Sequence, residues 1–157
     1  MAKNYSEAIN QAIENFFRED DWKYQPIDEN GIIKSGITLN SKLKRATIHV
    51  NVLENGFYVN VSPDLSADTD SRAAVAEFIT RANFGLGHGN FEMDYRDGEI
   101  RYKTTMYCGD QIPTFDQIKF LFYANIMTLD RYGNALAKVL FGMATPEEAI
   151  QEAENAN

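Results

Sequence analysis

The sequence predicts an α+β domain built on an antiparallel sheet. Two kinds of periodicity support this class: apolar residues recur at three-and-four spacing in four segments, and alternate with polar residues in short runs that end in turns. The runs form an early meander and a later hairpin, so the expected element order is α-β-β-β-β-α-β-β-α-α. We find no linker-like composition and no internal repeat, and therefore expect residues 1–157 to form one domain.

The N-terminal segment is expected to form an amphipathic helix over residues 5–19. Asn4 and Glu7 are spaced as a capping pair at its start. The meander follows as four strand candidates, at residues 22–27, 33–39, 43–53 and 57–61, the first of them interrupted by Pro26. Asn55-Gly56 is expected to close the last hairpin with the positive φ angles of a tight primed turn.

The second half of the chain is expected to begin with a helix over residues 71–84. Asp97-Gly98 then predicts the turn of a second hairpin, because alternating apolar residues lead into it and out of it. Thr114 and Gln117 form a capping box for a long helix over residues 115–141, in which Gly133 predicts a bend or a close contact. A final short helix is expected to start at Thr145-Pro146, with Thr145 and Glu148 forming a second capping box.

Charge and cysteine content exclude several classes of function. The chain has 23 acidic and 15 basic residues, a net charge of −8, which disfavours binding to nucleic acid or to anionic membranes. No apolar run approaches the roughly 20 residues of a membrane helix, and no signal peptide is evident. One cysteine cannot form an intramolecular disulfide. We therefore expect a cytoplasmic protein without cofactor or metal.

No arrangement of residues predicts a catalytic site. Asp64, Asp68 and Asp70 faintly resemble a calcium loop, but ligand positions of that loop are occupied by Arg72 and Ile79. Cys108 has no base or cation beside it in the sequence, and His49 falls on the expected solvent face of a strand. These residues are read as structural or solvated side chains.

The glycine-rich segment from Gly85 to Gly89 supports an alternative function. His88 lies between Gly87 and Gly89, where it would be accessible to a ligand. A dinucleotide-binding loop is excluded, because the glycines follow a helix and precede a strand. The alternative is therefore a small-molecule sensor or enzyme that uses Gly85, Gly87, His88 and Gly89.

Aromatic residues on the long helix provide the strongest indication of a binding surface. Phe120, Phe122 and Tyr123 spread around the helix rather than forming one stripe. We expect Phe122 in the core and take Phe120, Tyr123 and Met127 as candidate partner-binding residues. Core burial and subunit contact remain equally open for Phe120 and Tyr123.

Turn, cap and hairpin residues also form an ordered series over most of the chain. The series comprises Trp22, Asn55-Gly56, Arg81-Ala82-Asn83, Gly89, Phe91, Met93, Tyr95, Asp97-Gly98-Glu99-Ile100-Arg101-Tyr102, Asp130, Tyr132, Leu140-Phe141-Gly142 and Thr145-Pro146-Glu147-Glu148-Ala149. It resembles the YbjN family, whose members are described as bacterial sensory transduction regulators.

This resemblance implies a fold similar to type III secretion chaperones: a curved antiparallel sheet with helices packed on one face, often in a homodimer. Such chaperones hold extended protein segments in apolar grooves. The resemblance carries no catalytic residue, and fold alone does not fix function. We therefore predict a non-catalytic regulatory or chaperone-like module of a bacterial cytoplasm that forms a homodimer and binds a peptide or protein partner.

Overall fold

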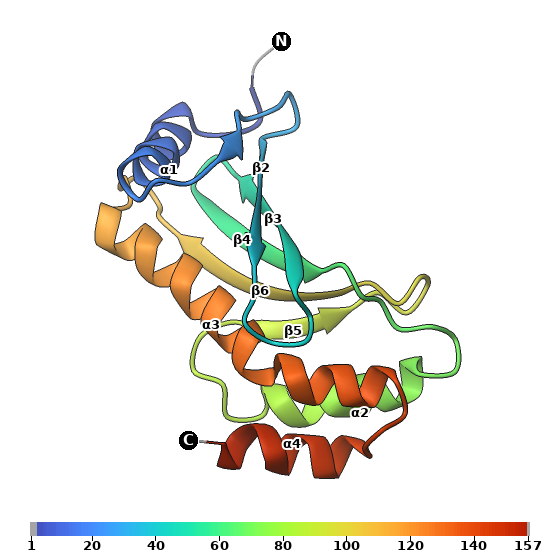
Figure 1. Cartoon of the computed structure of the whole chain (residues 1–157). Coiled ribbons are helices and arrows are strands. Elements are labelled where there is room, and N and C mark those ends of the chain that lie inside the picture. Colours follow the sequence, from blue (N-terminus) through green and yellow to red (C-terminus); the bar gives the residue numbers. More distant parts are fainter. Residues whose placement is uncertain (1–2, 157) are drawn as a thin grey trace.

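The computed structural model describes residues 3–156, which form four helices and a six-stranded antiparallel sheet (Figure 1). The strand order is β1-β2-β3-β4-β6-β5. The helices are α1 (Glu7–Glu19), α2 (Arg72–Asn83), α3 (Phe115–Leu140) and α4 (Pro146–Asn155). The strands are β1 (Tyr24–Gln25), β2 (Ile32–Thr38), β3 (Arg45–Val52), β4 (Gly56–Pro63), β5 (Asn90–Met93) and β6 (Ile100–Tyr107). The predicted α+β class and element order are confirmed.

One face of the curved sheet is apolar and carries the helices. Alternate side chains of β3 are buried, β4 buries Phe57, Val59 and Val61 on the same face, and opposite pairs such as Val50 and Val59 continue the apolar rows from strand to strand. Helix α3 crosses this face against β4 and β6, and α1 packs on α3. Helix α2 packs on β5, and α4 packs on α2 and α3 (Figure 1). The core therefore lies between α3 and the sheet.

Helix α1 begins two residues later than predicted, and its cap is a different residue. Ser6, not Asn4, is the N-cap, because its hydroxyl accepts a hydrogen bond from the backbone N–H of Ile9. Glu7 instead pairs with Lys3 on the surface. The apolar face of the helix buries Ile9, Ile13, Phe16 and Phe17.

Strand β1 is shorter than predicted, and the adjoining meander turns differ in detail. The strand has two residues because Pro26 has no N–H with which to extend the ladder. Strand β3 begins at Arg45 rather than Leu43, since Lys44 adopts a positive φ of 64° in the preceding turn. The loop between β2 and β3 is consequently compact, and it contacts α3.

The hairpin between β3 and β4 is confirmed, but its turn is not the predicted one. Val52 pairs with Phe57, three residues (53–55) connect the strands, and neither Asn55 nor Gly56 has a positive φ. Gly56 is required for another reason: a Cβ there would lie 2.4 Å from the carbonyl oxygen of Met106 on β6. Its role is close approach between strands rather than turn conformation.

The hairpin between β5 and β6 is also confirmed, with a longer loop than predicted. Met93 pairs with Ile100, so six residues connect the strands, and Gly98 takes a positive φ of 79° within that loop. The outer edge of β5 is blocked by Asn83 at the end of α2. Its side-chain amide accepts from the N–H of Phe91 at 2.7 Å and donates to the carbonyl of Phe91 at 3.0 Å. This pairing protects an otherwise open edge.

Both predicted capping boxes are present. Thr114 with Gln117 starts α3, and Thr145 with Glu148 starts α4, each by reciprocal side-chain and backbone hydrogen bonds. Pro146 occupies the first turn of α4, where its missing N–H costs no helical bond.

Candidate protein-docking surface

Helix α3 is fixed to the sheet by a buried amide. Asn125 is fully buried, and its side-chain nitrogen donates to the backbone carbonyls of Val59 at 2.9 Å and Tyr102 at 3.1 Å. These carbonyls belong to β4 and β6, so one side chain joins the helix to two neighbouring strands. The anchor sets the rotation of α3 and thereby determines which of its side chains face outward.

A second anchor holds the C-terminal half of α3 against the loop between β2 and β3. The carboxylate of Asp130 accepts from the backbone N–H groups of Asn40 at 3.1 Å and Ser41 at 2.8 Å. Asn134 accepts from the N–H of Lys42 at 2.8 Å. Burial raises the pKa of Asp130, but these hydrogen bonds outweigh burial and hold the pKa below its ordinary value.

With its inner face fixed, α3 presents an exposed ridge on the opposite side. Asp116, Phe120, Tyr123, Met127 and Arg131 follow one another at three- and four-residue spacing, and we call this ridge the α3 stripe. At its centre, Phe120 is 51% exposed, Tyr123 37% and Met127 66%, whereas Phe122 is fully buried. The predicted core position of Phe122 is therefore confirmed, and the three candidate residues lie together on one side of the helix.

Tyr123 is the most firmly held residue of the α3 stripe. Its hydroxyl donates to the Asp20 carboxylate at 2.8 Å, and that hydrogen bond, with burial, raises the pKa of Tyr123. Lys119 lies 3.6 Å from the same carboxylate and 5.7 Å from the centre of the Tyr123 ring. The aromatic ring is thus presented in a defined orientation, at little further cost in conformational entropy on binding.

The glycine-rich loop borders the α3 stripe. The ring of His88 packs edge-on against Phe120, with 4.8 Å between ring centres, and the carbonyl of His88 accepts from the Tyr102 hydroxyl. A Cβ at Gly85 or Gly87 would meet nothing within 4 Å, whereas at Gly89 it would lie 2.4 Å from the Lys103 carbonyl oxygen. His88 therefore forms an edge of the stripe, and the alternative of a ligand loop stays a prediction.

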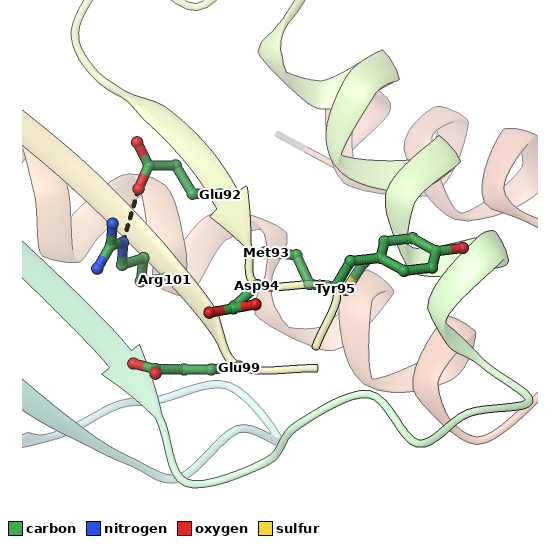
Figure 2. A pocket seen from close by; sticks show the side chains of 6 residues that line it. All are labelled: Glu92, Met93, Asp94, Tyr95, Glu99 and Arg101. Carbon is green, nitrogen blue, oxygen red and sulfur yellow. Dashed lines mark hydrogen bonds and ion pairs between the residues drawn. The ribbon is translucent and has the colours of Figure 1, made fainter. Parts of the chain in front are cut away.

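A polar hollow of about 510 Å³ lies where β5 and β6 meet their connecting loop (Figure 2). Glu92, Asp94, Glu99 and Arg101 line it, while the Tyr95 ring points away from the carboxylates. Arg101 Nε lies 2.6 Å from Glu92 Oε2, the ion pair drawn in Figure 2.

Two carboxylates of this hollow, those of Glu92 and Asp94, have cationic partners that favour their ionised form. Burial raises the pKa of Glu92, but its ion pairs with Arg101 and Lys103 outweigh burial and lower it overall. Hydrogen bonds from Arg96 lower the pKa of Asp94 to about 2. A general acid needs a raised pKa, so neither carboxyl is suited to donate a proton near neutral pH.

The Cys108 thiol lacks the environment of a nucleophile, and His49 lies on the open face of the sheet. Burial raises the pKa of the Cys108 thiol, which keeps it protonated and poorly nucleophilic at neutral pH. Burial, together with nearby Lys34, lowers the pKa of His49. His49 is on the open face of the sheet as predicted, but it is half-buried rather than fully solvated.

The open face of the sheet is polar across its centre. One cross-strand row carries Lys34, His49, Asn60 and Lys103, from β2 to β6. This row therefore does not form an apolar groove of the kind that the resemblance to secretion chaperones implies. Within residues 3–156, the helix that carries several exposed large apolar side chains in a row is α3, with Phe120, Tyr123 and Met127 of the α3 stripe.

Residues 10–138 match the sequence model of a known family, YbjN, described as "Putative bacterial sensory transduction regulator". The chain belongs to the YbjN family. The matched region runs from α1 into the last turns of α3 and includes the whole α3 stripe. Comparison with curated proteins finds no similar sequence.

Two further findings concern the part of the chain that the structure describes. None of its helices combines the length and hydropathy that crossing a bilayer requires. Residues 3–156 contain no cluster of three or more His, Cys, Asp or Glu side chains placed to hold a metal ion.

The two charged residues at the ends of the α3 stripe were not predicted from the sequence. Asp116 and Arg131 are exposed, and among residues 3–156 neither takes part in an ion pair. Their spacing from Phe120 and Met127 is the helical signal that could have revealed them.

Proposed function

We propose that this chain is a non-catalytic cytoplasmic regulator that works by protein–protein contact through the α3 stripe, and that its first partner is a second copy of itself. The observation that carries the proposal is the grouping of Phe120, Tyr123 and Met127 on the outward ridge of a helix that two anchors hold in place. Membership of a family described as regulators supports the same function.

The chemistry of the stripe favours a protein partner. Burying the exposed part of Phe120 and of Met127 would contribute roughly 1 to 2 kcal/mol each. A preformed ridge on a helix avoids the cost of ordering a loop on binding. The lowered pKa values of Glu92 and Asp94 and the raised pKa of Cys108 leave these three groups in their ordinary protonation states at neutral pH, so none of them is suited to general-acid or nucleophilic catalysis there.

Self-association can be tested with two matched double variants. Phe120→Glu with Met127→Glu places two charges on the α3 stripe and should convert a dimer to a monomer. The control is Phe141→Glu with Met143→Glu, which changes the same residue types at 66% and 73% exposure away from the stripe. It should leave the dimer intact.

Light scattering after size-exclusion chromatography measures the mass, and circular dichroism checks that each variant is folded. A wild-type monomer at micromolar concentration would contradict the proposal. So would equal dissociation of the dimer by the stripe variant and the control variant.

A further inference from the structure

The α3 stripe is self-complementary in one antiparallel arrangement, and we propose that two copies of the chain pair in that register. This inference rests on the proposed function, because it specifies how the same surface meets its own copy. A two-fold axis between Tyr123 and Ala124 places Phe120 opposite Met127 of the second copy. The same axis places Asp116 opposite Arg131, and symmetry repeats both pairs.

The chemistry of each pair supports this register. The pairs at the centre are apolar, and the pair at each end joins an exposed carboxylate to an exposed guanidinium. Neither Asp116 nor Arg131 has an ion-pair partner within residues 3–156, so both are available to a second copy. The contact would extend over about 22 Å of helix, from residue 116 to residue 131.

Neighbouring registers fit less well. Moving the axis about one turn toward the N-terminus brings Arg131 opposite residue 109, which precedes the start of α3 at Phe115. Moving it one turn toward the C-terminus brings Asp116 opposite Lys138, whose ammonium already pairs with Glu152 at 2.6 Å. Phe120 then faces Asn134 instead of an apolar residue.

Overall charge gives a further reason for this pairing. Each chain carries a net charge of −8, so two copies repel one another unless the contact itself avoids like charges. The α3 stripe contains one acidic and one basic residue and is neutral. In the proposed register, the four charged side chains that the two copies contribute form two pairs of opposite charge.

Charge reversal tests the end pairs. Asp116→Arg and Arg131→Asp should each weaken the dimer about tenfold, because both symmetry-related pairs become repulsive. The variant carrying both changes restores opposite charges across the contact and should recover most of the wild-type affinity. Sedimentation at low ionic strength measures the dissociation constant of each variant. Failure of the double variant to recover affinity would overturn the register.

Cysteine crosslinking tests the direction of the helices. In a Cys108→Ser background, Ala124→Cys lies beside the proposed axis and should form an intermolecular disulfide on mild oxidation. The control is Gln117→Cys, exposed on the same helix but about 20 Å from its own copy in this register. It should not crosslink.

Crosslinking of both variants would indicate parallel helices and overturn the proposal. If neither variant crosslinks while Phe120→Glu with Met127→Glu still dissociates the dimer, the register is wrong and the proposed function stands. If the chain remains monomeric in all these assays, both the proposed register and the proposed self-association are wrong.

Discussion

Substitution of Gly133 tests how closely α3 packs against the loop between β2 and β3. A Cβ at this position would lie 2.6 Å from the Cβ of Ser41 and 2.3 Å from its hydroxyl oxygen. Ser41 cannot readily withdraw, because its N–H and that of Asn40 are bound by Asp130. Gly133→Ala should gain about 1 kcal/mol of helix propensity but lose about 3 kcal/mol to overpacking. The expected net destabilisation is about 2 kcal/mol.

Ser41→Gly supplies the second arm of a double-mutant cycle. It removes both clashing atoms and leaves the flexible end of Leu43, at 3.1 Å, as the nearest contact. In that background Gly133→Ala should be neutral or stabilising, which gives a coupling energy of about 2 kcal/mol or more.

Urea unfolding followed by Trp22 fluorescence measures each variant at one fixed protein concentration, since self-association adds to stability. Trp22 packs against Phe16, Phe17 and Phe122 and reports on the core. A stabilising effect of Gly133→Ala in the wild-type background would refute this explanation of the glycine.

Three further predictions concern the anchors of the fold. Asn83→Ala should lower the free energy of unfolding by about 2 kcal/mol and speed hydrogen exchange at the Phe91 amide, since that N–H loses its acceptor. Unchanged exchange at Phe91 would contradict the role of Asn83 in blocking the edge of β5. Asn125→Ala should also lower the free energy of unfolding, measured in urea, by about 2 kcal/mol, because two strand carbonyls lose a hydrogen-bond donor. An unchanged free energy of unfolding would show that Asn125 does not anchor α3 to the sheet. The folded-state pKa of Asp130 is lowered, so its stabilisation is complete above the unfolded pKa and is lost as pH falls through the folded value. Asp130→Asn should remove that part of the acid dependence of the urea midpoint, and an unaltered pH profile would count against it.

The periodic parts of the fold could be predicted from sequence because they depend on local patterns. The capping boxes at Thr114 and Thr145 and the alternation in β3 each involve residues a few positions apart. The turn between β3 and β4 was mispredicted because the glycine at position 56 is required by close packing against the backbone of Met106 on β6. That contact joins residues about fifty positions apart in the sequence. No local pattern contains that contact.

The candidate surface was predictable only in part, for the same reason. The spread of aromatic residues around the long helix indicated Phe120, Tyr123 and Met127 as candidates, but it left core burial and subunit contact equally open for Phe120 and Tyr123. The side chains of the α3 stripe face outward because Asn125 and Asp130 fix the rotation of the helix, and the partners of these two residues lie on β4, β6 and the loop between β2 and β3. The polar character of the open sheet face likewise emerges only when the strands are aligned.

Methionine oxidation is the most direct test of the central claim that the α3 stripe is a protein contact. Met127 and Met143 are similarly exposed in one copy of the chain, at 66% and 73%. If the stripe is covered by a second copy, hydrogen peroxide should oxidise Met143 much faster than Met127 in the native protein, and both at the same rate after unfolding. Equal oxidation of the two methionines in the native protein at micromolar concentration would contradict the account.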